Sequence, residues 1–264
     1  MSHQNESTHN RKPEITLATH ASHAHIDNSA THHHDVSHSH GHDHGHGHNH
    51  SLVEELICHV PYAIFSVAFS LIVLSFLAYA SQSVADPKML KKGYKMLFHS
   101  FHFMHIVFAA TGTLITYFRF SKNMLAGLVM GIISPTLFCT LSDSILPYLG
   151  GRALGVSMHF HMCFLTELPN VLPFLFVGIL NGILMSWHSE SRQSQYSLFS
   201  HFVHIFISSL ASSFYLVAHG FTNWYSQIGS VFLFLIFAVV IPCTVSDVIV
   251  PMLIAKAHTK DEKH

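Results

Sequence analysis

Two apolar stretches of this 264-residue chain repeat a cysteine and an aspartate at a spacing that suits metal binding. CTLSDSILP occupies residues 139–147, and CTVSDVIVP occupies residues 243–251. In both, the aspartate follows the cysteine by four positions, so on a helix the thiol and the carboxylate share one face. A carboxylate inside a membrane span costs about 2.5–3.5 kcal/mol on insertion scales, so such a residue generally faces a cavity or a partner. The alternatives are neutral, hydrogen-bonded aspartates and cysteines that only pack.

Two histidine pairs accompany these motifs. One pair lies in HFMHI from residue 102 and the other in HFVHI from residue 201, and each pair is spaced to share a helix face. Imidazole, thiolate and carboxylate together suit zinc, cobalt, nickel or ferrous iron rather than calcium or magnesium, which prefer oxygen ligands. We predict a polar pathway and two further metal ligands, Cys139 and Cys243; the pathway residues are His59, His102, His105, Asp143, Glu167, His201, His204 and Asp247.

The first fifty residues are polar and rich in histidine, and they include the tract HHHDVSHSHGHDHGHGHNH. They hold too few bulky apolar residues to form a core, so residues 1–50 are expected to be disordered. Neutral imidazoles on flexible spacers bind transition metals at pH 7, although a solvated tail without a role is the alternative. The predicted tail ligands are His32, His33, His34, His38, His40, His42, His44, His46, His48 and His50, and His159 and His161 are predicted as a gate or as ligands.

The remaining chain must supply the elements that position these side chains. It is strongly apolar: 49% of all residues are hydrophobic and 10% are Asp, Glu, Lys or Arg. Each apolar run is near the roughly 20 residues that a bilayer requires, and it is apolar nearly all round, unlike a helix of a soluble protein. The six predicted spans are Leu56–Ala80, Leu97–Phe118, Leu125–Leu149, Cys163–Trp187, Phe199–Val217 and Ile228–Ala255.

The motifs recur in the same order, which indicates an internal duplication. The histidine pairs are offset by 99 residues, the cysteine–aspartate motifs by 104, and the HVP at 59–61 and the ELP at 167–169 by 108. Three spans in each copy would insert the second copy upside down. We therefore predict an all-α integral membrane fold of six transmembrane helices in a 3+3 inverted repeat after a disordered tail. The expected domains are 1–50, 51–157 and 158–257, with a C-terminal tail at 258–264.

This topology predicts two polar stations in opposite halves of the bilayer. His102, Asp143 and Glu167 would hold an ion near one surface. His59, His204 and Asp247 would hold an ion near the other. Prolines in the third and sixth spans would interrupt the helices and free backbone groups to line a cavity.

The histidine tract resembles segments of zinc transporters, such as cation diffusion facilitators and ZIP proteins, and of nickel and cobalt carriers. The stretch from Ser142 to Pro147 resembles a Ser-Asp-x-x-x-Pro segment of multi-span heavy-metal exporters. These resemblances imply a metal transporter. The expected substrate is a divalent transition metal, zinc first and then nickel or cobalt, with ion or proton coupling and no organic cofactor.

Two other functions remain open. The histidines loosely resemble the boxes of membrane di-iron oxygenases and desaturases, although those boxes include adjacent histidines and cluster on one membrane face. A metal-sensing accessory subunit is the other alternative. The chain lacks a G-x-x-x-x-G-K-[ST] nucleotide loop, and we do not expect an enzyme. We expect a multi-pass protein of a bacterial inner membrane with both termini cytoplasmic, partnered by lipid and metal ions and compatible with a homodimer. Its net charge of −1 gives no reason to expect nucleic acid.

Overall fold

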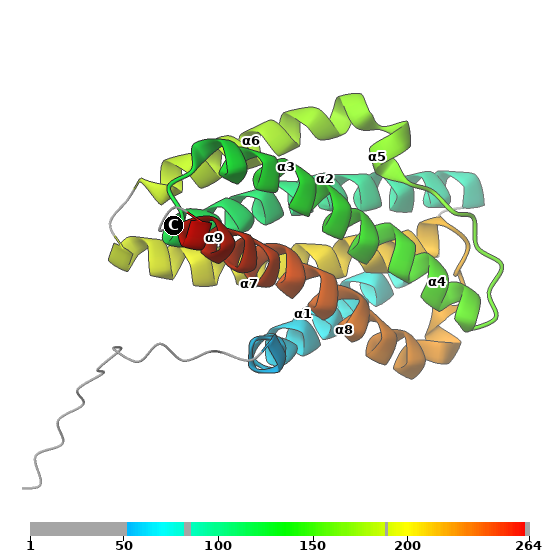
Figure 1. The fold of residues 1–264 in the computed structure, drawn as a ribbon. Helices are drawn as coiled ribbons and strands as arrows, with labels where there is room; N and C mark the ends of the chain where they lie inside the picture. Colours follow the sequence, from blue (N-terminus) through cyan, green and yellow to red (C-terminus); the bar gives the residue numbers. More distant parts are fainter. Residues whose placement is uncertain (1–51, 82–85, 188–189, 262–264) are drawn as a thin grey trace, which may run out of the picture. The chain divides into compact units, whose positions relative to one another are not determined.

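The structure is a computed structural model and describes residues 52–81, 86–187 and 190–261. Every regular element in these ranges is helical (Figure 1). The ten predicted tail ligands lie outside the described residues. The elements are α1 (Leu52–Ala80), α2 (Pro87–Phe120), α3 (Met124–Thr140), η2 (Leu141–Ile145), α4 (Leu146–Ala153), α5 (Cys163–Thr166), α6 (Leu168–Ser186), α7 (Glu190–Ala218), η3 (Trp224–Gln227), α8 (Ile228–Thr244), η4 (Val245–Ile249) and α9 (Val250–Asp261).

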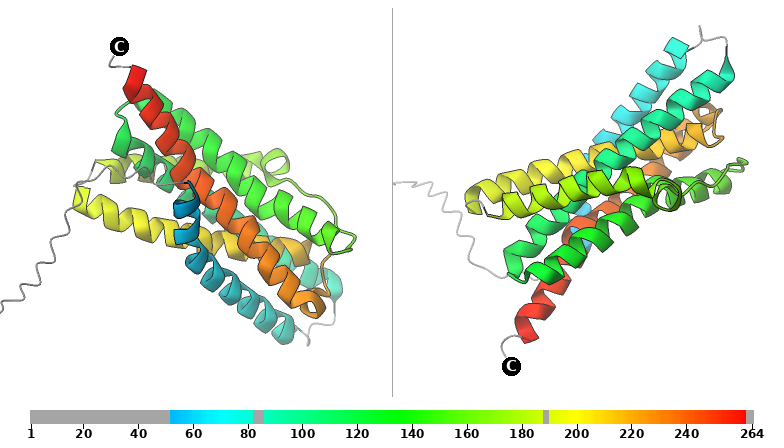
Figure 2. Two further views of the ribbon diagram at one scale, coloured as in Figure 1. Left: turned by 60° about the horizontal axis from the view of Figure 1, so that its bottom comes forward. Right: turned by 90° about the horizontal axis from the view of Figure 1, so that it is seen from above.

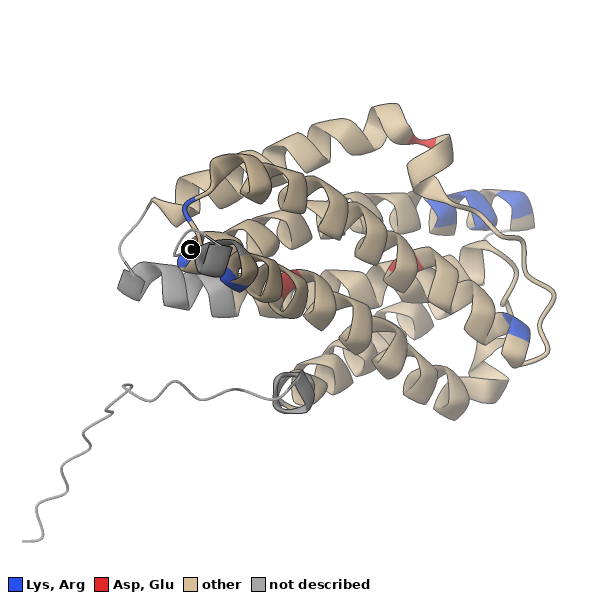
Figure 3. Cartoon of the chain, viewed as in Figure 1, with Lys and Arg blue, Asp and Glu red and all other residues tan. Residues whose placement is uncertain are grey.

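Within the described residues, six helical stretches are long and apolar enough to cross a bilayer. Large apolar side chains such as Phe76, Phe176 and Phe237 point outwards, whereas the interior holds histidine, serine, threonine and aspartate. Lysine and arginine gather at the two ends of the bundle (Figure 3). In a lipid solvent apolar side chains can face outwards, whereas ionisable side chains are kept inside the bundle. The prediction of an all-α fold with six long apolar helices is confirmed for the described residues. The spans are His59–Ala80, Pro87–Phe120, Met124–Ala153, Leu168–Ser186, Phe199–Ala218 and Trp224–Ala257.

Helices α2 and α7 form the centre of the bundle. In their most apolar windows 72% and 78% of the residues are buried, against 33% for α1 and 22% for α6. The two helices run antiparallel, because Phe98 near the start of α2 packs on Tyr215 near the end of α7, and His105 packs on His204. Helix α1 covers α7, and α6 covers α2. The residues that belong to the histidine pairs therefore lie on the two innermost helices.

Helix α6 approaches α2 closely because small residues line their contact. A Cβ added to Gly178 would lie 2.7 Å from the backbone oxygen of Val107, and one added to Gly182 would lie 2.8 Å from Cβ of Leu114. Without a hydrophobic driving force between helices in lipid, such close packing is a main source of their association. This contact fixes the outer side of α2 while its other side faces α7.

The starts of two spans differ most from the predicted residues. Helix α2 starts at Pro87, ten residues before the predicted span, because Asp86 caps it by accepting a hydrogen bond from the Lys88 N–H at 2.8 Å. The predicted span at Cys163–Trp187 is wrong in its first turn. The short helix α5 ends at Thr166, and α6 restarts at Leu168 with a proline in its first turn, where the missing N–H costs least.

Candidate metal centre

Both cysteine–aspartate motifs contain a five-residue π-helical segment. Helix α3 passes into η2 and then α4, and α8 passes into η4 and then α9, each forming one continuous rod (Figure 2). The π segments hold Asp143 and Asp247. A π turn inside an α-helix is rare and is common at functional sites. The predicted interruption of the third and sixth spans is therefore a widened turn and not a break.

The proline of each motif follows the π turn and removes a backbone N–H there. In the π turn the N–H of Leu146 bonds to the oxygen of Leu141, five residues earlier, so the next bond would run from residue 147 to Ser142. Pro147 has no N–H, and the Ser142 oxygen instead accepts the hydroxyl of Ser212 at 3.0 Å. A buried carbonyl is thus freed by proline and satisfied by a hydroxyl of helix α7.

The second motif has the equivalent bond. Pro251 leaves the oxygen of Ser246 without an N–H, and that oxygen accepts the hydroxyl of Thr113 on α2 at 3.1 Å and the hydroxyl of Ser134 on α3 at 3.1 Å. Thr113 and Ser212 differ by 99 positions, the same offset as the histidine pairs. Each rod is therefore fastened at its π segment to one of the two central helices.

Asp143 joins the first histidine pair. Its Oδ2 atom lies 2.9 Å from Nδ1 of His102 and 2.7 Å from Nδ1 of His105, and all three side chains are fully buried. An ionised carboxylate only accepts, so each Nδ1 would carry the hydrogen, and in a neutral imidazole Nε2 would then keep its lone pair. The other oxygen, Oδ1, accepts hydrogen bonds from the hydroxyls of Ser142 at 2.8 Å and Ser208 at 2.9 Å. This is the arrangement in which carboxylates orient metal-binding imidazoles.

Asp247 joins the second pair in the same way. Its Oδ2 atom accepts a short hydrogen bond from Nδ1 of His204 and lies 3.4 Å from Nδ1 of His201. Its Oδ1 atom has no partner among the described residues, unlike Oδ1 of Asp143. The two clusters are therefore similar in plan but unequal in their serine support.

The two clusters touch. The ring centroids of His105 and His204 are 4.4 Å apart, and Nε2 of His105 lies 3.7 Å from Sγ of Cys243. Ligand atoms of His105, His204 and Cys139 all lie within 4.8 Å of one another. The sequence analysis predicted two separate stations in opposite halves of the bilayer, whereas in the structure the two clusters form one continuous buried group. The cysteines of both motifs lie at this junction.

The group continues towards the start of α1. The ring of His59 lies 4.1 Å from the ring of His201, centroid to centroid. We name the whole set the imidazole–carboxylate line; its members in spatial order are His102, Asp143, His105, His204, Asp247, His201 and His59.

Three imidazole nitrogens of the line are buried without a hydrogen-bond partner among the described residues: Nε2 of His102, His201 and His204. Buried polar atoms in native proteins nearly always have a partner, and each exception requires an explanation. Since the Nδ1 atoms already face carboxylates, a divalent transition metal at Nε2 would satisfy these atoms with the ligand type it prefers.

The other predicted site residues lie elsewhere. Glu167 lies at the junction of α5 and α6, where its Oε2 accepts a hydrogen bond from the side chain of Asn170, so it does not join Asp143. His159 is exposed, and its backbone N–H bonds to the oxygen of His219. His161, a predicted ligand, lies with His99 and Cys163. The sequence analysis did not predict those two residues as ligands.

Sequence reasoning also missed the residues that support the aspartates. Nothing in the sequence distinguished Ser208 and Ser212 of α7 from other serines in an apolar run. The one available signal was the pair of Ser-Ser dipeptides at 208–209 and 212–213, an unusual number of serines for a buried helix. Gly112 was missed too. A Cβ there would lie 2.5 Å from Oδ2 of Asp247, so the glycine makes room for that carboxylate.

Replacing Gly112 with alanine is expected to destabilise the protein, although alanine normally improves a helix by about 0.5–1 kcal/mol over glycine. The new methyl group would displace Asp247 from His204. Thermal unfolding of the purified protein in detergent measures the effect. Gly93, on the same helix, has no atom within 4 Å of an added Cβ, so Gly93→Ala is the matched control and should not lower the melting temperature. Equal melting temperatures for the two variants would contradict the role given to Gly112.

Comparison of the chain with protein-family models, with curated proteins and with solved structures gave no match. The described residues form a helical bundle with six helices long and apolar enough to cross a membrane, and its buried histidine, cysteine and aspartate side chains lie close enough together that they could hold a metal ion.

Proposed function

We propose that this chain is an integral membrane carrier of divalent transition-metal ions, with zinc as the first candidate and nickel or cobalt next. The observation that carries the proposal is the contact between His105 and His204, which joins two histidine–aspartate clusters into one line through the middle of the bundle. Buried ionisable residues in membrane spans generally mark a substrate or ion route. A line of them in mutual contact is what such a route requires.

The centre of the line is the proposed main binding position. His105 and His204 would each offer Nε2, and Cys139 and Cys243 would offer their sulfur atoms. Two imidazoles and two thiolates are a ligand set suited to zinc. Asp143 and Asp247 would act behind the histidines, because each fixes a ring by accepting its Nδ1–H.

We further propose that residues 51–157 and 158–257 are copies of opposite orientation. Three observations support this: α2 and α7 are antiparallel, both cysteine–aspartate motifs are π-helical, and the hydroxyl bonds to Ser142 and Ser246 come from positions at the offset of the repeat. Rocking of one copy against the other would expose the line alternately to the two sides, as in other carriers built from inverted repeats.

Protons are the proposed coupling ions. Metal ligands must be deprotonated to bind, so a proton taken up by the line would release the metal. The histidine-rich tail, which precedes α1 in the chain, would hold a local pool of metal and raise its effective concentration. We propose no enzymatic activity for the chain itself.

Zinc uptake into liposomes that contain the purified full-length protein tests the proposal. A chelating dye inside the liposomes should report saturable uptake that an imposed pH gradient changes. A resident metal site in a sensor or accessory subunit would bind zinc and give no uptake above protein-free liposomes, and that outcome would refute the carrier.

A further inference from the structure

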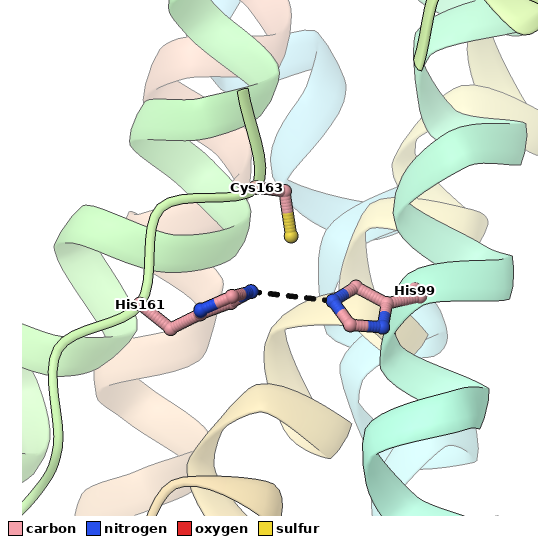
Figure 4. A group of neighbouring side chains, drawn as sticks. All are labelled: His99, His161 and Cys163. Atoms are coloured by element: carbon pink, nitrogen blue, oxygen red, sulfur yellow. Dashed lines mark hydrogen bonds between the residues drawn. The ribbon is translucent and has the colours of Figure 1, made fainter. Parts of the chain in front are cut away.

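A second group of metal-ligating side chains lies outside the imidazole–carboxylate line. It consists of His99 on α2, His161 in the segment before α5, and Cys163 at the start of α5 (Figure 4). Their ligand atoms all lie within 4.8 Å of one another, and in Figure 4 the sulfur of Cys163 points towards the space between the two rings. The three residues come from two distant parts of the sequence.

The distances fit a tetrahedral metal ion. Nε2 of His99 lies 3.3 Å from Nε2 of His161. Two nitrogens bound to zinc at its usual bond length lie about 3.3 Å apart when the ion is tetrahedral. Without a metal, one of these imidazoles donates a hydrogen bond to the other, so the same two atoms are already at the separation that a shared ion would need.

The position of His161 is set by helix α7. Its backbone N–H donates to the hydroxyl of Tyr215 at 3.1 Å, and its ring stacks on the ring of His219 with centroids 5.4 Å apart. Two residues earlier, the N–H of His159 donates to the oxygen of His219 at 2.9 Å. A segment without regular structure is thus fastened at two points and presents His161 to His99 in a fixed place.

The surroundings favour a ligand that exchanges. Cys163 is fully buried, whereas His99 and His161 are partly exposed, so a fourth position faces the outside of the group. Three protein ligands with one open position are typical of sites where a small ligand comes and goes, unlike closed structural sites.

We propose that His99, His161 and Cys163 form a second binding site for a divalent transition metal of the zinc and cobalt type. It lies at the end of the bundle where α2 begins and α7 ends, one helical turn from His102 on α2. As a loading or release position for the line it rests on the proposed carrier function. As a metal site it stands on its own geometry.

Cobalt(II) titration of the purified full-length protein tests this site, because a cobalt–thiolate bond gives a charge-transfer absorption that histidine alone does not give. The tail of residues 1–50 contains no cysteine and adds nothing to this band. A variant with Cys58, Cys139 and Cys243 replaced by serine keeps Cys163 as its one thiol. It should show the band. Adding His161→Ala or His99→Ala should weaken cobalt binding at least about ten-fold.

His159→Ala is the matched control, since His159 lies in the same segment, is exposed, and belongs to none of the metal-ligating groups found among the described residues. It should leave the band unchanged. If the triple serine variant does not fold, His161→Ala and His159→Ala are compared in the otherwise native chain, where only the former should reduce the band. No band from Cys163 as the sole cysteine, or equal bands with and without both histidines, would overturn the proposal.

Zinc uptake by the same variants separates the two proposals. A band without uptake in any variant would refute the carrier and leave the metal site in place. Uptake in the native chain without a Cys163 band would refute the second site and leave the carrier in place.

Discussion

Replacing Asp143 and Asp247 together with asparagine is expected to abolish the change in zinc accumulation that the protein causes, so that cells expressing the variant accumulate as much zinc as cells that lack the protein. Asparagine has the same size but no charge, so it cannot hold two imidazole N–H groups as an ionised carboxylate does. Loss of such a partner lowers metal affinity about 10–100-fold. Since the two clusters share one line, the loss at both should stop flux.

Asp86→Asn is the matched control for this experiment. Asp86 caps α2 from an exposed position, and asparagine is an equally good cap, so accumulation should not change. Membrane levels of each variant are measured by immunoblot. Normal accumulation in a fully expressed double variant would refute the role of the line.

Replacing His105 and His204 with alanine, singly and together, is expected to give strongly non-additive losses of zinc flux. The two rings are in contact and would bind one ion, so removing either should reduce flux about as much as removing both. Initial uptake rates in proteoliposomes for the two single variants and the double variant provide the cycle.

If the two clusters bound ions independently, this double-mutant cycle would give the opposite result: the fold-losses of zinc flux in the two single variants would multiply in the double variant. His159→Ala, an exposed histidine outside the line, should retain full flux and controls for the loss of an imidazole as such. Multiplying losses would separate the clusters functionally, and they would contradict the single central position at His105 and His204.

The sequence predicted the chemistry of the site better than its assembly. The i, i+3 histidines and the i, i+4 cysteine and aspartate follow from helix geometry alone, and both sets lie where helices place them on shared faces. The pairing of His102 and His105 with Asp143 also follows from the predicted antiparallel spans. These relations depend on one or two neighbouring helices, which a periodic pattern specifies well.

What the sequence could not predict depends on how the halves pack. The contact between His105 and His204 is set by the register of α2 against α7, and no pattern within either helix fixes that register. The π segments likewise arise from Pro147 and Pro251 acting with hydroxyls on another helix. Glu167 was grouped with Asp143 because the fourth span was predicted as one helix. In the structure the helix is interrupted at Glu167, between α5 and α6.

The site at His99, His161 and Cys163 left a partial signal in the sequence. His99 precedes His102 by three positions and continues the histidine face of α2. Cys163 gave no such signal, because a single cysteine in an apolar run is more commonly a packing residue. Only the bonds that fasten the segment before α5 to α7 bring the three side chains together.

Anomalous diffraction at the zinc absorption edge, from crystals of the full-length protein grown with zinc, tests the central claim most directly, because it locates each metal ion whatever the tail binds. The account predicts an ordered zinc ion within the helical bundle, bonded to Nε2 of His105 and Nε2 of His204. Zinc found only outside the bundle, with those two rings still packed against each other, would contradict it.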